Sequence, residues 1–364
     1  MFDIAKLDPN FAVETSIRTD DTVFYDVKEH PFCLYGLLYE NGSYQRLPDA
    51  VAERVSPAVF RLNKHTAGGR IRFVTDSPFV SIVASMPIQK PENNHSATGS
   101  SSFDLFVDGR YKSTFVYPMS NPNDRGYESR KTIPHGHLDL TDGVLENGET
   151  GSREITIHFP LYHAVRELHI GLKKGASFLP APAYASGKRA ITYGSSITQG
   201  GSASIPGLAY SNLLAMRLGI DLWNFGFSGN AKGEDAICDY IAAQKSDIFI
   251  MDYDHNAPSL EHLINTHEHF FLRFREKCPD TPVIMLSAPN FDCAPSWFGP
   301  RRAVVRKTYK NAIARGDKNV YFIDGKTLFG KRDRDLCTVD ATHPNDIGHM
   351  RMASCIARVL KKLM

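Results

Sequence analysis

The sequence has no long apolar run: no stretch approaches the roughly 18 uninterrupted apolar residues that a membrane-spanning helix needs. The first residues also lack the basic start and apolar core of a secretory signal. These two absences predict a soluble, cytoplasmic protein with no transmembrane segment and no encoded export signal.

An excess of charge of either sign is also missing. Lys and Arg number 42 against 40 for Asp and Glu, so the formal net charge is +2 at pH 7. A nucleic-acid partner or an anionic membrane surface would favour a basic excess, so we predict neither. The charge balance favours a small or neutral molecule as the partner. It leaves the oligomeric state open, a homo-oligomer included.

The cysteines lack the spacing of a metal site or a disulfide framework. There are six, at positions 33, 238, 278, 293, 337 and 355, and no two form a C-x-x-C pair. This pattern predicts reduced thiols in a cytoplasm. His135 and His137 have the spacing of a metal pair, but two histidines in a polar loop are more often simply solvated. We therefore predict no metal.

Apolar and polar residues alternate along the first half of the chain, from about residue 20 to 172. The alternation is clearest at 80–86, 103–107 and 155–159, and it indicates half-buried strands. Asp108-Gly109 lies between two such runs, which is a strong hairpin signal. Many short strands, turn clusters and no long helix predict an antiparallel β-sandwich of jelly-roll type. Two polar stretches, about 88–102 and 118–134, are predicted to be long loops, either functional or disordered.

The pattern changes after residue 172. Residues 173–188 lose the alternation and contain two prolines and two glycines, which is typical of a linker. Beyond them, five apolar strands alternate with helical patterns such as 208–218 and 301–314, which predicts a parallel sheet covered on both faces. The strands are expected at 190–193, 221–225, 247–252, 282–287 and 319–323. The predicted organisation is a β-sandwich accessory domain (1–175), a linker (176–188) and an α/β domain (189–364).

Gly194-Ser195-Ser196 follows the first of these strands. Right-handed crossovers bring the carboxyl ends of parallel strands to one rim, where open α/β sheets bind their ligands. A serine on a sharp turn there can supply both an attacking oxygen and a backbone N–H for the same reacting atom. Strand alternation sends the two serines to opposite faces, and we assign Ser196 as the nucleophile. The alternative is a plain turn, since a phosphate cradle would need a lysine and a glycine spacing that are not present.

Two other rim segments carry groups that complement a serine nucleophile. Asp340 and His343 are three positions apart, so the carboxylate could hold the imidazole while the other ring nitrogen faces Ser196. Alternatively, Asp340 caps a helix that begins near Asn345. The glycines of segment 224–229 let the backbone approach a ligand closely, or simply form a tight turn.

Taken together, these segments resemble the SGNH, or GDSL-type, hydrolase family. Gly194-Ser195-Ser196-Ile197 looks like its first block, segment 224–229 like its second with Gly229 as an oxyanion donor, and Asp340-Ala341-Thr342-His343 like its last. The resemblance covers about residues 188–364 and implies a flavodoxin-like three-layer α/β/α domain that requires no metal or organic cofactor. In the first half, Ser102-Phe103-Asp104-Leu105-Phe106 is similar to a Gly-x-Asp-Leu-Tyr phrase of the β-domain that precedes some SGNH hydrolases. Two-domain carbohydrate esterases share this layout.

The chain departs from the family pattern in two places. Ser195 stands where the family usually has an aspartate beside the nucleophile. Segment 252–256 replaces the usual Gly-x-Asn-Asp block. His255 and Asn256 are therefore both candidates for the side-chain oxyanion donor. Asn256 is the better one because an amide donates at every working pH, whereas an imidazole donates from the required nitrogen only in one tautomer or when charged. The alternative is that Asn256 only shapes the turn into the next helix.

The resemblance implies a serine ester hydrolase that removes acetyl groups from carbohydrate esters, such as oligosaccharides or xylan- and mannan-type polymers. Ser196 would attack the acyl carbon, His343 would relay the proton and Asp340 would orient His343. The N–H groups of Ser196 and Gly229, together with Asn256, would hold the oxyanion. The candidate substrate contacts are His255 and Trp297, the latter in a rim stretch, 290–298, that mixes aromatic and polar residues. That mixture leaves a lipid or thioester acylhydrolase as an alternative, and a non-catalytic carbohydrate-binding protein as another.

Overall fold

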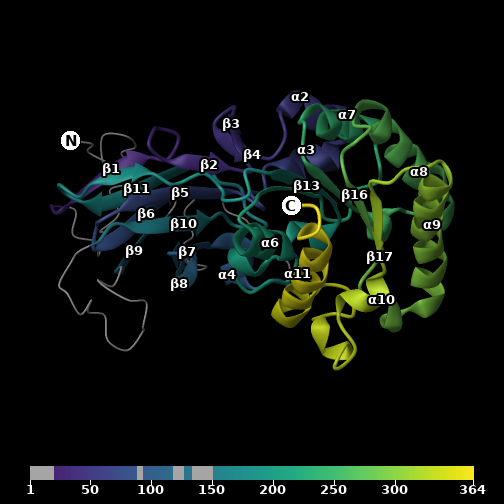
Figure 1. Cartoon of the computed structure of the whole chain (residues 1–364). Helices are drawn as coiled ribbons and strands as arrows, with labels where there is room; N and C mark the ends of the chain where they lie inside the picture. The colour runs from purple at the N-terminus through teal and green to yellow at the C-terminus, as the bar shows by residue number, and fades with distance from the viewer. Residues whose placement is uncertain (1–19, 88–92, 118–126, 133–150) are drawn as a thin grey trace.

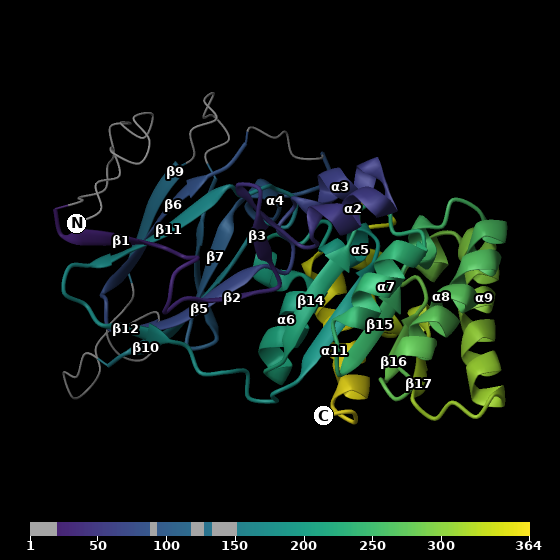
Figure 2. The ribbon, with the colours of Figure 1, turned by 90° about the horizontal axis from the view of Figure 1, so that it is seen from above.

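The computed structural model describes residues 20–87, 93–117, 127–132 and 151–364. Two predictions fall outside these ranges: the one about a metal pair rests on His135 and His137, and the one about an export signal rests on the first 19 residues. The chain forms two parts that lie side by side, an N-terminal β-rich part and a C-terminal α/β part (Figures 1 and 2). None of the helices in the described ranges has both the length and the apolar character needed to cross a membrane.

Two antiparallel sheets form the N-terminal part. The first has the order β1-β11-β6-β9, made of Thr22–Asp26, Glu167–Lys173, Phe79–Ser85 and Tyr127–Thr132. The second has the order β12-β5-β10-β7-β8, made of Phe178–Pro180, Arg70–Thr75, Arg153–His158, Phe103–Val107 and Arg110–Phe115, with β2 (Cys33–Tyr35) also paired to β5. A separate hairpin consists of β3 (Leu38–Glu40) and β4 (Ser43–Gln45).

The core of this part lies between the two sheets and contains the apolar positions of the predicted alternation. Ile82, Leu105 and Ile157, one from each of three predicted strands, are completely buried. The hairpin predicted at Asp108-Gly109 joins β7 to β8, and both residues have positive φ, as a tight two-residue turn requires. The predicted antiparallel sandwich is confirmed.

Segment 118–134 is not one long loop as predicted. Within it, Tyr127–Thr132 is the edge strand β9, paired antiparallel to β6. The sequence of this strand is polar at nearly every position, so it has no apolar alternation by which it could be recognised. The other predicted loop, 88–102, contains the short helix α4 (Ala97–Ser101).

Five parallel strands form the sheet of the C-terminal part, in the order β14-β13-β15-β16-β17. They are Asp221–Gly226, Arg189–Gly194, Ile248–Asp252, Val283–Leu286 and Val320–Ile323, close to the predicted ranges. The helices are α5 (Ser196–Gln199), α6 (Tyr210–Leu218), α7 (Asp235–Ala243), α8 (Leu260–Lys277), α9 (Pro295–Ala314), α10 (Gly325–Leu328) and α11 (Asp346–Leu360). Helices cover both faces of the sheet, so the predicted three-layer α/β/α arrangement is confirmed (Figure 2).

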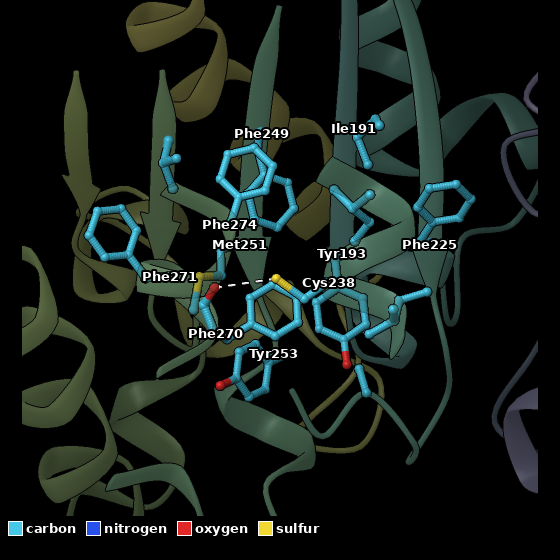
Figure 3. Packing of buried hydrophobic residues seen from close by; sticks show 14 of the residues in the cluster. Ile191, Tyr193, Phe225, Cys238, Phe249, Met251, Tyr253, Phe270, Phe271 and Phe274 are labelled. Carbon is cyan, nitrogen blue, oxygen red and sulfur yellow. Dashed lines mark hydrogen bonds between the residues drawn. The ribbon is translucent and has the colours of Figure 1, made fainter. Parts of the chain in front are cut away.

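An aromatic cluster fills the space between the sheet and the helices α7, α8 and α9 (Figure 3). Tyr193 of β13 stacks on Phe270 of α8 with ring centroids 5.2 Å apart, and Phe249 of β15 packs against Phe274 at 4.6 Å. Tyr193 is therefore fixed one residue before the strand ends at Gly194, and the turn that carries the two serines begins from a rigid position.

Two short helices from the N-terminal half complete this same core. They are α2 (Asp49–Val55) and α3 (Pro57–Asn63), and both views place them beside α7 (Figures 1 and 2). Ala52 and Val59, one from each helix, are buried in the cluster of the α/β part, as is Leu47 just before them. Neither helix was predicted, because seven residues are too few to establish a helical period.

We therefore expect residues 189–364, expressed alone, to fail to fold cooperatively. Without α2 and α3 the fragment would expose the apolar face that Ala52 and Val59 cover, and burial of such surface contributes about 25 cal/mol per Å². Thermal unfolding followed by near-ultraviolet circular dichroism would test this. A fragment with a sharp transition close to that of the full chain would contradict the expectation.

The segment predicted to be a linker contains β12, which pairs with β5 and so belongs to the second sheet. Close to it, a buried ion pair joins the two parts: Arg70 of β5 donates to Asp221 of β14 at 2.8 Å and to the carbonyl of Leu222 at 3.0 Å. Because Arg70 is completely buried, separation of the two parts would leave its charge without these partners.

Candidate active site

Ser196 lies in the turn where β13 meets α5. No side chain fits at Gly194, since a Cβ there would lie 2.3 Å from the Asp252 carbonyl oxygen. Ser195 is the N-cap of α5, and its hydroxyl accepts a hydrogen bond from the N–H of Ile197 at 3.2 Å. The hydroxyl of Ser196 faces the other way, with its Oγ 2.9 Å from Nε2 of His343. The structure thus brings Ser196, and not Ser195, to the histidine.

Asp340 and His343 lie together in the loop before α11. Oδ2 of Asp340 is 2.7 Å from Nδ1 of His343, and Oδ1 accepts the backbone N–H groups of Thr342 at 3.0 Å and His343 at 2.7 Å. The helix that follows is capped by Asn345, so the alternative role of Asp340 as a helix cap does not apply. Ser196, His343 and Asp340 therefore form one continuous hydrogen-bonded chain.

The carboxyl of Asp340 is held in its ionised form. Burial alone would raise its pKa, but the hydrogen bonds from the backbone and ring of His343 and from the Asn94 amide outweigh burial and hold the pKa of Asp340 well below its usual range. An ionised carboxylate behind the imidazole fixes the tautomer in which Nδ1 carries the proton. Nε2 can then accept the proton of Ser196.

Three further histidines surround His343 and are all neutral at pH 7. Burial lowers the pKa of His95 to about 4, that of His255 to about 3 and that of His349 to about 4, and the proximity of His343 adds to each effect. In the described residues, Asp340 is the only ionised side chain within hydrogen-bonding distance of His343. The electrostatic surroundings of His343 are therefore set mainly by this one carboxylate.

The protein is expected to lose stability as the pH falls from about 6.5 to about 4. Five buried or half-buried histidines keep their pKa at about 4 or below in the folded chain. In the unfolded chain they bind protons below about pH 6.5, so the unfolded state binds more protons in this range. They are His65, His95, His255, His267 and His349. Burial raises the pKa of Asp252 to about 7 and of Asp254 to about 6, so these two carboxyls bind protons more readily in the folded chain. They favour the folded state as the pH falls, but they are two groups against five.

Urea unfolding at pH 6.5, 5.5 and 4.5 would measure this effect as a falling free energy of unfolding. His267 is a suitable single probe. It is buried, its Nδ1 lies 2.8 Å from the hydroxyl of Thr308, and it belongs to none of the segments around Ser196. His267→Gln should make the dependence on pH shallower. A free energy of unfolding that is constant or rises toward pH 4.5 would contradict the prediction.

Segment 226–229 faces the nucleophile turn from β14. Gly226 packs directly against α5, where a Cβ would lie 2.2 Å from the backbone nitrogen of Gln199. Gln199 in turn accepts the N–H of Ser228 through its side-chain oxygen at 3.0 Å. Gly229 has a φ of +67°, and within the described residues its N–H donates to no protein group. This N–H is therefore available to a ligand.

Segment 252–256, which replaces the usual third block, runs from the last residue of β15 into the short helix η3 (Asp254–Asn256). The amide nitrogen of Asn256 donates to the carbonyl of Phe227 at 2.9 Å, which ties this turn to segment 226–229. One amide hydrogen is used in that bond, and the second remains for another acceptor. Arg301 of α9, almost completely buried, clamps the turn by donating to the carbonyls of Asp254 at 2.8 Å and Ala257 at 2.9 Å.

His255 and Trp297 are placed differently from Asn256. The ring of His255 packs on Phe298 with centroids 5.1 Å apart, and its Nε2 is buried with no hydrogen-bond partner among the described residues. Trp297 is half exposed on α9, where the guanidinium of Arg301 lies 4.1 Å from its ring centroid. Within the described residues, no hydrogen bond or ring contact joins Trp297 to Ser196, His343 or Asp340.

Sequence reasoning considered a functional role for the polar stretch 88–102 but singled out neither Asn94 within it nor Tyr162. The amide of Asn94 donates to Oδ2 of Asp340 at 2.7 Å, and the hydroxyl of Tyr162 donates to the carbonyl of Ser196 at 3.0 Å. No local signal singles out either residue, because Asn94 lies in an ordinary turn cluster more than 240 residues before its partner. In the part of the chain that the structure describes, no three His, Cys, Asp or Glu side chains are grouped as a metal ion would require.

The two halves of the chain each match a known family model. Residues 187–361 match the GDSL-like lipase/acylhydrolase family, and residues 22–178 match the N-terminal domain, named GxDLY, of SGNH-hydrolase-type esterases. The chain belongs to the SGNH hydrolases. It is a carboxylic ester hydrolase whose catalytic domain follows a β-sandwich domain, as the blocks around Ser196, Gly229 and His343 predicted.

Solved structures of several other proteins share the whole two-part fold. A protein described as a GDSL-like lipase from Bacteroides ovatus is 26% identical, with a TM-score of 0.79 over 94% of this chain and 98% of that one. A salicylyl-acyltransferase from a tetracycline biosynthetic pathway is 21% identical, with a TM-score of 0.74 over 95% and 98%. A family two carbohydrate esterase from Clostridium thermocellum is 13% identical, with a TM-score of 0.62 over 91% and 98%. No curated protein matches the sequence.

Proposed function

We propose that this esterase removes acetyl groups from carbohydrate esters through an acyl-enzyme formed on Ser196. The observation that carries the proposal is the hydrogen-bonded chain from Ser196 Oγ through His343 to Asp340, at 2.9 and 2.7 Å. The shared fold with carbohydrate esterases of family two, one of them in complex with a cello-oligosaccharide, supports the choice of a sugar ester.

The first half of the reaction transfers the acyl group to the serine. Ser196 Oγ attacks the acyl carbon while its proton passes to Nε2 of His343, and the ionised Asp340 stabilises the imidazolium that forms. The negative charge on the former carbonyl oxygen is held by the N–H groups of Ser196 and Gly229 and by the amide of Asn256. The imidazolium then returns its proton to the sugar oxygen as the carbon–oxygen bond breaks, which releases the sugar hydroxyl.

The second half repeats these steps with water. His343 takes a proton from water, the hydroxyl attacks the acetyl-enzyme, and acetate leaves as Ser196 recovers its proton from His343. No step needs a metal or an organic cofactor. The six cysteines are free thiols in the structure, which supports the cytoplasm as the proposed compartment.

Acetate release from acetylated xylo-, manno- and cello-oligosaccharides would test the proposal, with p-nitrophenyl acetate as a small reference ester. We expect kcat/KM on at least one acetylated oligosaccharide to exceed that on the reference ester. Higher kcat/KM on long-chain acyl esters or on acyl thioesters would favour the lipid or thioester hydrolase instead. Saturable binding of an oligosaccharide without turnover of any ester would favour a non-catalytic carbohydrate-binding protein.

A further inference from the structure

Asn94, from the β-sandwich half, contacts the acid of the catalytic chain. Its Nδ2 lies 2.7 Å from Oδ2 of Asp340 and 3.2 Å from Nδ1 of His343. We propose that Asn94 is a positioning residue that holds the carboxylate of Asp340 in place behind His343. The inference rests on the proposed role of His343 as the general base.

The chemistry of the contacts requires that the amide nitrogen, and not the amide oxygen, face the carboxylate. Oδ2 of Asp340 accepts from His343, and only a second donor can share that oxygen without repulsion. Oδ1 already accepts the N–H groups of Thr342 and His343. Asn94 is therefore the fourth donor to a carboxylate that has about four lone-pair sites, and it completes the set.

Asp340 needs such a contact because it is not enclosed by its own loop. Its side chain is 32% exposed, so it could turn away from His343 toward water. Three of its four donors come from its own loop, two of them backbone N–H groups on Oδ1. Asn94 is the donor from outside the loop, and it restrains the rotation of the oxygen that His343 uses.

Asn94 is itself anchored to the loop that follows the nucleophile helix α5. Its carbonyl accepts the hydroxyl of Ser202 at 2.8 Å. Two residues further on, the hydroxyl of Ser96 donates to the carbonyls of Ala203 at 3.2 Å and Ser204 at 3.1 Å. These bonds fix Asn94 relative to the loop that follows Ser196, and the amide of Asn94 in turn holds Asp340, so the β-sandwich half takes part in the geometry of the site.

A charge at position 94 would act strongly on His343. The titratable groups that face His343 are Asp340 from its own loop, His95 beside Asn94, His255 from η3 and His349 from α11. Because the three histidines are neutral at pH 7, Asp340 is the only ionised side chain within hydrogen-bonding distance of His343 in the described part of the chain, so little would screen a new carboxylate. A carboxylate within about 4–6 Å typically raises the pKa of a histidine by about 1–3.

The test compares Asn94→Asp with Asn93→Asp, which places the same charge on an exposed neighbouring asparagine. The measurement is the pH dependence of kcat/KM on p-nitrophenyl acetate. In Asn94→Asp the introduced carboxylate lies beside the carboxylate of Asp340, and repulsion between them favours binding of one additional proton by the two carboxylates and His343. The enzyme is active only after that proton is lost. The acid limb of the profile should therefore move upward by about one pH unit or more, with activity recovered at alkaline pH. In Asn93→Asp the limb should stay within a few tenths of a pH unit.

Asn94→Ala and Asn93→Ala provide a second measurement that does not depend on the added charge. Loss of a hydrogen bond to an ionised group corresponds to about a tenfold effect, so Asn94→Ala should lower kcat about tenfold with KM within about twofold. Asn93→Ala should retain the parental kcat. Thermal unfolding of all four variants shows whether any loss of activity follows from unfolding.

The outcomes separate this inference from the proposed function. No turnover of any ester by the parent protein would overturn the function itself. An active parent whose Asn94→Asp variant keeps the parental acid limb, or whose Asn94→Ala variant keeps the parental kcat, would overturn the inference alone. If Asn94→Asp fails to fold, the alanine pair decides.

Discussion

Replacement of Ser196 by alanine is expected to lower kcat by about four decades or more, with the fold intact. Ser196 Oγ lies 2.9 Å from Nε2 of His343, so the substitution removes the group proposed to form the acyl-enzyme. A serine hydrolase without its nucleophile retains only the rate enhancement that binding and the oxyanion donors supply. The measurement is acetate release under single-turnover and steady-state conditions, together with the absence of a burst.

Ser195→Ala is the matched control. Its hydroxyl caps α5 through the N–H of Ile197, and loss of an N-cap typically costs about 1 kcal/mol of stability. We expect a lower melting temperature and a kcat within about tenfold of the parent. A greater loss of kcat in Ser195→Ala than in Ser196→Ala would show that Ser196 is not the nucleophile.

Asn256→Ala is expected to lower kcat by about 10²–10³ with little change in KM. The loss of one oxyanion donor typically has an effect of this size, because the donor acts on charge that appears only in the transition state. The amide of Asn256 is oriented by its bond to the carbonyl of Phe227 at 2.9 Å, which leaves one N–H for the proposed oxyanion site. Because Asn256→Ala also removes this hydrogen bond, we expect a small loss of stability, about 1 kcal/mol, which thermal unfolding would measure separately.

His255→Ala distinguishes the two candidate donors. Burial keeps His255 neutral, with a pKa of about 3, and its ring packs on Phe298. We expect its replacement to leave kcat within about tenfold of the parent, unless the ring contacts the substrate, in which case KM rises. If Asn256→Ala folds normally and keeps nearly full kcat while His255→Ala does not, the oxyanion donor is His255.

Local patterns predicted the strands that carry an apolar period, and the hairpin turn between two of them. The alternation around Ile82 and Leu105 and the five apolar strands each follow a period along one element. The Asp108-Gly109 hairpin reflects pairing between residues close in sequence. Elements without such a period were missed. The helices α2 and α3 are too short, and β9 is polar along its length.

The sequence by itself determined the two-part architecture and the presence of a serine, a histidine and an aspartate at the rim of a parallel sheet. It determined these because strand ends follow from the apolar period, and the carboxyl ends of parallel strands share one edge. The sequence already assigned Ser196 as the nucleophile, and the tertiary structure shows the contact with His343 that this role requires, with Ser195 used as a helix cap instead. Only the tertiary structure decided that Asn94 supports Asp340, because a hydrogen bond across 246 residues depends on how the two halves pack.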